Sequence, residues 1–419
     1  MLVYKTRREE YRKIYNKNRV LDRDDIFNLV CYRADDIDDA FVFAEGQFDV
    51  AVKDADVARK MEQNAAKRRV IPRSVNPDDS LAMVHPHDWC SGFFGGSLWQ
   101  FYEYSNRPSD RIRAISWTWP IEEAKWHKGT HDLGFMMNNS FGKAYRLTGE
   151  QSYCDVMLQS ARTLTTRYSP VVKSIRSWDH NRQVWSYPVI IDNLMNLEML
   201  FDAFNLSGDS IFREVAVNHA NTTMKNHFRP DFSSYHVVDY DPATGNVRGK
   251  FTHQGNSDDS FWSRGQGWGL YGYAMCYRYT GDEKYLRQSE AIADFILSLP
   301  NMPADMILYW DMKMVEVNDR TPDNVNPDVP RDASSAAIIA SGLYELASYV
   351  DARKSRRYVE AADRIVDSLS HHYQARKGGD HGFLLLHSVG HHPGGSEIDV
   401  PINYADYYYL EALLRKRAR

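Results

Sequence analysis

Cysteine is scarce in this chain, and its four cysteines stand far apart in the sequence. Cys31, Cys90, Cys154 and Cys276 form no CxxC pair of the kind that zinc sites and redox sites use. We therefore expect neither a disulfide framework nor a zinc site. Cys154 and Cys276 lie in apolar helical patterns and are expected to be buried thiols.

Sequence patterns that bind metals or nucleotides are not evident either. The chain contains no Walker phrase, so we do not expect a nucleotide cofactor. Five histidines lie in loops, outside any helical HxxxH or HExxH pattern, and we interpret them as solvated or structural: His85, His87, His387, His391 and His392. The prediction is that the protein uses no metal and no cofactor.

Long apolar runs and an excess of positive charge are missing too. No stretch approaches 18 consecutive apolar residues, so we expect no transmembrane span and no membrane partner. A formal net charge of −5 does not favour nucleic acid as a partner, since that needs a basic excess. The basic N-terminal segment has no apolar run after it. The protein is therefore expected to be cytoplasmic as the sequence is written, or periplasmic if a signal peptide has been removed.

Aromatic residues are plentiful, and some gather in one stretch with polar partners. The chain has 10 Trp and 26 Tyr among 419 residues, and residues 252–269 read THQGNSDDSFWSRGQGWG. Indole faces beside hydrogen-bond donors suit a pyranose ring, which has apolar faces and a polar edge. The forked guanidinium of Arg264 suits a carboxylate on such a ring. The alternative is a tryptophan-rich helix start packed in a core, but core packing does not explain the Arg, Gln and Asp among the indoles.

One phrase recurs along the chain and predicts its fold. Apolar helices end in an aromatic residue, a short turn follows, and an amphipathic helix begins, as in YRLTGEQSY from Tyr145 and YRYTGDEKY from Tyr277. The pattern predicts six apolar helices at 93–104, 134–147, 191–205, 265–279, 334–349 and 403–416. It also predicts six helices that are charged on one face, at 37–66, 110–126, 151–167, 209–226, 282–298 and 356–372.

These two sets predict an all-α (α/α)6 barrel with six inner and six outer helices. Residues 37–419 are expected to form it as a single catalytic domain, after an N-terminal extension at 1–36. Strand signals are confined to short stretches such as YHVVDY and FLLLH.

Tight turns at one end of such a barrel leave its long connections at the other end. These connections return from an outer to an inner helix, at 67–92, 127–133, 168–190, 227–264, 299–333 and 373–402. The unusual polar phrases of the chain lie in them, and a rigid scaffold commonly carries its site on such loops. Segments that are distant in the sequence are therefore predicted to meet at one mouth.

Asp132 and Asp192 share one context, at or just before the start of an inner helix. Either residue could be a helix N-cap, which is a common position for Asp. As a pair, they match the two carboxylates of glycoside hydrolysis, one of them kept protonated by burial or by a like charge. Since a helix N-terminus opposes such a raised pKa, the acid needs an apolar wall or its partner's charge. His131 and His236 are interpreted as substrate contacts or core histidines.

Four phrases of the chain resemble one known family. HDLGFM, IIDNLMNLEMLF, HQGNSDDSFWSRGQGWGLYGYA and INYADYYYLEAL are similar to sequences of the unsaturated glucuronyl hydrolases, glycoside hydrolase family 88. The resemblance covers about residues 37–416, and members of the family are (α/α)6 barrels. It implies a glycosidase that removes the 4,5-unsaturated uronic acid from the non-reducing end of lyase-generated glycosaminoglycan oligosaccharides. The implied chemistry is acid-catalysed hydration of the enol ether double bond.

The resemblance also implies roles for individual residues. Asp192 matches the acid/base that protonates carbon 4, and Asp132 matches the second carboxylate, which holds ring hydroxyls and helps to keep Asp192 protonated. Phe94 stands where the family often has Trp, and it can stack on a sugar without an indole N–H. The residues that we expect to bind the substrate are His131, His236, Gln254, Trp262, Arg264, Trp268 and Phe94, with Arg264 toward the uronate carboxylate.

Three other interpretations stay open at this point. An unsaturated rhamnogalacturonyl hydrolase acting on pectin fragments has the same barrel, but the SRGQGWG and HDLGFM phrases match the glucuronyl group better. A sugar isomerase or epimerase on the same toroid would want two histidines at the barrel centre, where this chain has aspartates. A barrel that only binds sugar is the third. The expected partner is an unsaturated uronyl oligosaccharide, and the expected state is a monomer or a homodimer.

Overall fold

Two concentric sets of helices make up the molecule. The computed structural model describes residues 35–314 and 329–419. The inner set comprises α5 (Ser91–Ser105), η2 (Gly134–Gly142) with α7 (Lys143–Thr148), α9 (Asn193–Ser207), α11 (Ser263–Thr280), α13 (Ala333–Leu346) and α15 (Asn403–Arg417). The outer set comprises α3 (Asp35–Ala58), α6 (Pro108–Thr118), α8 (Gln151–Thr165), α10 (Ser210–Asn226), α12 (Glu283–Leu297) and α14 (Ala352–His372).

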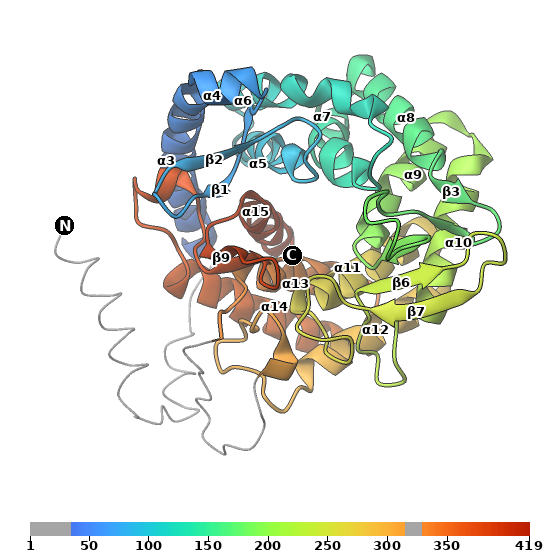
Figure 1. Cartoon of the computed structure of the whole chain (residues 1–419). Coiled ribbons are helices and arrows are strands. Elements are labelled where there is room, and N and C mark those ends of the chain that lie inside the picture. The colour runs from blue at the N-terminus through green and yellow to red at the C-terminus, as the bar shows by residue number, and fades with distance from the viewer. Residues whose placement is uncertain (1–34, 315–328) are drawn as a thin grey trace.

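The inner helices form a closed ring. α5 packs on η2 and η2 on α9, and the contacts continue through α11 and α13 to α15, which returns to α5. Figure 1 looks into this ring and shows the outer helices around its rim. Within the described residues, six inner helical segments lie inside six outer ones, which is an (α/α)6 toroid. The predicted fold class is confirmed.

Burial separates the two sets in the way that their sequences predict. Every residue of α13 is buried. The outer helix α14 buries one stripe at helical spacing, made of Tyr358, Ala361, Ala362, Ile365, Val366 and Leu369. A helix that is apolar all round needs protein neighbours on every side, so α13 belongs inside the ring and α14 outside it.

Glycines and aspartates set the tight turns at one end. Gly149, Gly208 and Gly281 end α7, α9 and α11 in the left-handed conformation, at φ of 70°, 72° and 65°, which glycine adopts without strain. Asp209 and Asp282 then start α10 and α12, because each carboxylate accepts the N–H two residues further on at 3.1 Å. These turns belong to the recurring phrase in the sequence.

The long connections carry short antiparallel sheets. β1 (Ile71–Val75) pairs with β2 (Leu81–Val84), β3 (Tyr168–Ser169) with β4 (Ser174–Ile175), and β8 (Ser388–His391) with β9 (Ser396–Val400). β5 (Pro188–Ile190), β6 (Val237–Tyr240) and β7 (Val247–Phe251) form a three-stranded sheet. Each of these strands precedes an inner helix in the chain, so the sheets surround one end of the ring.

Some local predictions differ from the structure. YHVVDY contains β6, as predicted, but the prediction of a strand in FLLLH at 383–387 was wrong. The N–H groups of Leu384 and Leu385 donate to the carboxylate of Asp406, each at 3.0 Å, and so are not available to a strand ladder. The helix expected at 110–126 changes at Trp119 into the 3₁₀ segment η1 (Trp119–Trp126), since Pro120 has no N–H for an α-helical bond. The helix expected at 37–66 divides into α3 and α4 (Glu62–Ala66).

Two expectations from composition can be compared with the described residues, whereas the expected N-terminal extension lies almost wholly outside them. Cys154 and Cys276 are buried free thiols, as predicted, and Cys90 is a third. None of the described helices is both long and apolar enough to cross a membrane. The extension expected at 1–36 falls outside the described residues, apart from the two aspartates that begin α3, and its boundary with the barrel stays a prediction.

Glycine also lets neighbouring inner helices approach closely. A Cβ atom on Gly96 of α5 would lie 2.4 Å from the carbonyl oxygen of Asn139 in η2 and 2.7 Å from the ring of Tyr407 in α15. The side chain of any other residue at this position would therefore push α5 away from both of its neighbours in the ring. Gly46 in the outer helix α3 has no atom within 4 Å of the same position.

Gly96→Ala is expected to lower the free energy of unfolding by about 1–3 kcal/mol, because the added methyl group opens the packing of the ring. Gly46→Ala is the matched control, and it should be neutral or stabilising by up to about 1 kcal/mol, since alanine loses less backbone entropy in a helix. Urea unfolding followed by circular dichroism measures both values. Equal effects of the two substitutions would contradict the crowding of the inner helices.

Candidate active site

The N-termini of the inner helices meet the long connections at one end of the ring. Asp132 comes shortly before η2, Asp192 is the N-cap residue of α9, and Trp262 and Asp332 are the N-cap residues of α11 and α13. The aligned peptide dipoles of a helix place a partial positive charge at its N-terminus. This end of the ring therefore favours an anionic ligand.

Asp192 stands at a helix start without capping it. Its side chain accepts no hydrogen bond from the first turn of α9, and its Oδ2 atom is enclosed with no hydrogen-bond partner. Burial, which leaves 7% of the residue exposed, raises the pKa of Asp192 to about 6. The charges of His131 and Arg264 oppose this rise in pKa, and the charge of Asp132 adds to it. The capping interpretation does not apply to Asp192, whose carboxyl group is a buried acid available to a ligand.

His236 faces the carboxyl group of Asp192, with 3.6 Å between Nε2 and Oδ2. Nδ1 of His236 accepts the backbone N–H groups of His253 at 3.1 Å and Gln254 at 3.0 Å, so the proton of the neutral ring lies on Nε2. Burial lowers the pKa of His236 well below its ordinary value, and the neighbouring His253 lowers it further. The ring therefore presents an N–H group to Asp192 without the positive charge that would ionise the acid.

Asp132 is held in its ionised form by its neighbours. The hydroxyl group of Thr130 donates to Oδ2 of Asp132, and Nε2 of His131 lies 3.1 Å from Oδ1. Burial alone raises the pKa of Asp132, but the contacts with His131 and Thr130 outweigh burial and bring the pKa below its usual value. His131 is itself buried, with its Nδ1 atom 3.2 Å from the hydroxyl of Ser177.

Helix packing brings Asp132 and Asp192 close enough for their charges to interact. η2 and α9 are neighbours in the ring, and the backbone N–H of Phe135 donates to Oδ1 of Asn196 at 2.8 Å across their first turns. The charge of Asp132 raises the pKa of Asp192, as a nearby like charge does. Two carboxyl groups with pKa values pushed apart by their surroundings are typical of an acid and its ionised partner in an active site.

Arg264 is bonded to carbonyl groups of the protein itself. Its guanidinium donates to the carbonyl oxygen of Val389 and, at 2.7 Å, to that of Gly390, and one Nη atom lies 3.4 Å from Asp332. It also stacks on the indole of Trp262 at 4.3 Å, and 1% of the residue is exposed. This placement favours a positioning role, in which Arg264 holds β8 against α11, over the direct contact with a substrate carboxylate expected from the sequence.

Gln254 and Trp262 lie beside His236. Nε2 of Gln254 donates to the carbonyl oxygen of Gly390 at 3.1 Å, and the ring of Trp262 packs on the ring of His236 at 4.7 Å between centroids. Both residues therefore contact His236, whose other ring nitrogen faces Asp192, and their contact with a substrate stays a prediction.

Two of the residues expected to contact the substrate are buried, and for Trp268 the contact stays a prediction. Trp268 is fully buried, with its ring 5.1 Å from that of Phe135. Phe94 is buried on the outward side of α5, where its ring lies 5.7 Å from Phe48 of the outer helix α3. The expectation that Phe94 stacks on a sugar is corrected by this contact. The helical period turns its neighbour Phe93 toward the inner ring and Phe94 toward the outer helices.

Two residues at the mouth were not among the expected contacts. The half-buried Trp178 has its ring 5.6 Å from that of His253, and Nε2 of His391 lies 3.4 Å from Nε2 of His253. A signal for Trp178 exists in the sequence, because the phrase RSWDHNRQVWSY lies in one of the long connections. His391 was interpreted as solvated or structural, since no sequence pattern pairs it with a residue 138 positions away.

Several buried polar atoms around Asp192 have no hydrogen-bond partner. Besides Oδ2 of Asp192, they include Nε2 of His236, Nε of Arg264 and Nε1 of Trp178. A buried polar group without a partner costs about 1–3 kcal/mol, and native structures contain few of them. Those at this mouth can form hydrogen bonds with a polar ligand.

Asp192→Asn is expected to stabilise the folded protein at neutral pH. A carboxyl group whose pKa rises from 3.8 to about 6 on folding costs about 3 kcal/mol of stability once it is ionised. The cost is absent below about pH 4, where the acid is protonated in both states, and it grows as the pH rises through about 6. The gain in melting temperature should therefore be larger at about pH 7.5 than at about pH 4.

Differential scanning calorimetry at the two pH values measures this difference. Asp155→Asn, which replaces an exposed carboxylate on α8, is the control and should change little at either pH. A gain for Asp192→Asn that does not vary with pH would contradict the raised pKa.

Comparison with known proteins identifies one family. The model of Glycosyl Hydrolase Family 88 matches residues 58–411. An unsaturated glucuronyl hydrolase of Formosa agariphila is 45% identical over 349 residues, which cover 83% of this chain and 84% of that protein. An unsaturated chondroitin disaccharide hydrolase of Streptococcus pneumoniae is 32% identical over 367 residues, which cover 86% and 89%. The crystal structure of an unsaturated glucuronyl hydrolase specific for heparin has a TM-score of 0.79 at 43% identity, covering 89% of this chain and 96% of that one.

Proposed function

Because this chain belongs to glycosyl hydrolase family 88 and is a glycosidase, we propose that it removes the 4,5-unsaturated uronic acid from the non-reducing end of glycosaminoglycan oligosaccharides. Support comes from its relatives, which include an unsaturated glucuronyl hydrolase and an unsaturated chondroitin disaccharide hydrolase. These relatives favour this substrate over unsaturated rhamnogalacturonyl fragments. The observation in the structure that carries the proposal is the carboxyl group of Asp192, buried, unpaired and protonated up to a pH of about 6.

Asp192 supplies the proton that starts the reaction. Its carboxyl group protonates carbon 4 of the C4=C5 double bond, and a cation develops at carbon 5, stabilised by the adjacent ring oxygen. Water adds to carbon 5 and loses its own proton to the Asp192 carboxylate, which restores the acid. The resulting hemiketal opens, the glycosidic bond breaks, and the uronate leaves as a 4-deoxy-5-keto sugar.

Asp132 and His236 keep Asp192 in the form that this step needs. The negative charge of Asp132 raises the pKa of Asp192, while His236 is neutral and adds no opposing charge. The Nε2–H group of His236 also points at Asp192 from 3.6 Å and can orient the carboxyl group or share a hydrogen bond with the substrate. Asp132 accepts hydrogen bonds from the hydroxyl groups of the bound ring.

The remaining residues shape the place for the sugar. Trp262 packs on His236, the half-buried Trp178 lies beside His253 with an indole ring that suits a sugar, and Gln254 adds an amide next to them. Arg264 holds the β8 backbone that closes this side of the mouth. The protein is expected to work as a monomer or a homodimer, which stays a prediction.

Asp192→Asn is expected to lower kcat for unsaturated disaccharides by at least about 10²-fold, because general acid catalysis contributes about 10²–10⁴-fold and an amide cannot donate this proton. The loss of the alkene absorbance measures the rate. Asp155→Asn is the matched control and should keep the wild-type rate. A variant at position 192 that kept most of the rate would remove Asp192 from the proposed role.

The substrates for this assay are the unsaturated disaccharides of chondroitin, hyaluronan and heparin, with an unsaturated galacturonyl-rhamnose from pectin beside them. Turnover of a glycosaminoglycan disaccharide and not of the pectin fragment supports the proposal. Turnover of the pectin fragment alone would show a rhamnogalacturonyl hydrolase, and isomerised sugar with no loss of absorbance would show an isomerase.

The pH dependence provides an independent test of the acid. Since the protonated form of Asp192 is the active form, kcat/KM should fall as the pH rises through about 6. Asp132→Asn removes the like charge that raises the pKa of Asp192, so the fall should move to lower pH in the residual activity of this variant. A fall that moves to higher pH, or does not move, would contradict the coupling between the two carboxyl groups.

A further inference from the structure

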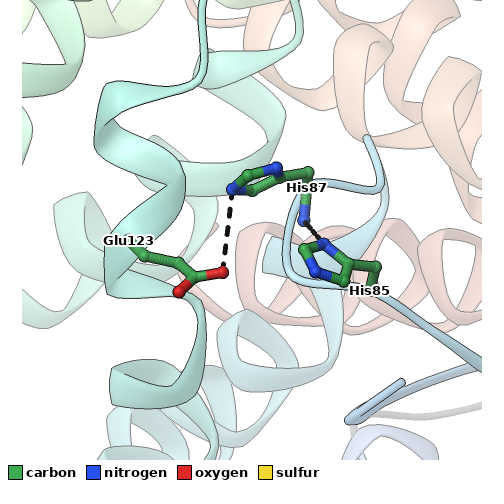
Figure 2. A group of neighbouring side chains, drawn as sticks. All are labelled: His85, His87 and Glu123. Atoms are coloured by element: carbon green, nitrogen blue, oxygen red, sulfur yellow. Dashed lines mark hydrogen bonds and ion pairs between the residues drawn. The ribbon is translucent and has the colours of Figure 1, made fainter. Parts of the chain in front are cut away.

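Two histidines and a glutamate meet outside the proposed sugar site. His85 and His87 lie in the loop between β2 and α5, and Glu123 lies in η1, on the neighbouring part of the chain (Figure 2). One nitrogen of each imidazole and one carboxylate oxygen lie within 4.8 Å of one another. Nε2 of His87 lies 3.7 Å from Oε1 of Glu123.

Only one of the two carboxylate oxygens of Glu123 has a hydrogen-bond partner in the protein. Oε2 accepts a hydrogen bond from the guanidinium of Arg68, which fixes the orientation of the carboxylate. Oε1 is enclosed and has no hydrogen-bond partner, although it faces His87. A carboxylate with one oxygen anchored and the other enclosed and unpaired resembles a metal ligand held by an outer partner.

The imidazole of His87 packs on a neighbouring ring and is also accessible to solvent. The ring of His87 stacks on that of His127 at 4.3 Å, and its side chain is 38% exposed, which leaves a path from solvent. Nδ1 of His85 accepts the backbone N–H of His87 at 3.1 Å.

We propose that His85, His87 and Glu123 form a site for a divalent transition-metal ion of the zinc type. Two imidazole nitrogens and a carboxylate oxygen are a ligand set that Zn²⁺ takes in proteins, with a fourth, open position for water. Bonds of about 2.0–2.2 Å require ligand atoms within about 4 Å of each other, so the side chains close by small rotations when the ion binds.

Binding also rearranges one hydrogen bond. If Nε2 of His85 is the ligand atom, the proton of this neutral ring moves to Nδ1. The backbone N–H of His87 then exchanges its bond to Nδ1 for one to water. The total number of protons on the ring does not change.

The position of the site suggests what a bound ion does. His85 and His87 are on the segment that leads into α5, and η1 leads through His127 to Asp132 at the start of η2. An ion shared by both segments cross-links two neighbouring parts of the mouth. The site uses none of the residues that surround Asp192, so a test of metal binding does not depend on the proposed reaction.

Isothermal titration of the chelator-treated full chain with Zn²⁺ tests the proposal. One equivalent should bind, and Glu123→Gln should weaken binding at least about tenfold, since an amide is a poorer ligand than a carboxylate. His85→Ala/His87→Ala should abolish binding. His371→Ala/His372→Ala, which removes an adjacent pair on α14, is the matched control and should bind as the wild type does.

A second measurement keeps the result independent of folding defects. Zn²⁺ should raise the melting temperature of the wild type and of the α14 control, and not that of the His85→Ala/His87→Ala variant, whose circular dichroism spectrum shows whether it is folded. The His253–His391 pair at the mouth is the competing place for an ion, with 3.4 Å between nitrogens. Zn²⁺ binding that survives His85→Ala/His87→Ala and disappears in His391→Ala would overturn the proposal, as would the absence of binding to the wild type.

Discussion

The inner helices form a closed ring, and this closure determines how every other element packs. α15 has to return to α5, so each inner helix packs between two others and against an outer helix, and its surface is apolar on nearly all sides. This arrangement also fixes the direction in which the inner helices run. Every inner helix follows an outer helix and a long connection, and all inner N-termini therefore lie at one end. The site is a consequence of this arrangement, because the segments that precede the inner helices have nowhere else to meet.

The same arrangement creates an electrostatic conflict at Asp192. A helix N-terminus favours an ionised carboxylate, whereas the proposed reaction needs a protonated one. Burial and the charge of Asp132 together outweigh the helix and raise the pKa of Asp192 to about 6. The neutral state of His236 also helps to keep Asp192 protonated, since a charged imidazole at 3.6 Å would ionise the acid. The folded state is less stable as a result, as is common where a site holds an unpaired buried group such as the carboxyl group of Asp192.

Two arginines show how the mouth is assembled from distant segments. Arg264 of α11 holds the carbonyl groups of β8, and Arg73 of β1 makes a two-point ion pair with Glu397 of β9. The hairpin β8–β9 is thus tied to two elements far from it in the sequence. Arg264 illustrates the limit of reasoning from residue type: its fork suits a carboxylate, but in the folded chain backbone carbonyl groups occupy both of its ends.

Local sequence signals are enough to predict the helical ring. The period of the apolar residues, the glycines at 149, 208 and 281, and the aspartates that follow them are local signals, and the structure confirms the helices and tight turns that they predict. Three contacts are visible only in the folded chain: Phe94 faces an outer helix, His391 touches His253, and Glu123 faces His87. The difference lies in the sequence separation of the interacting residues. Helix propensity and capping depend on residues within a few positions of each other, whereas the contacts and pKa values of a site depend on groups that only the closed ring brings together.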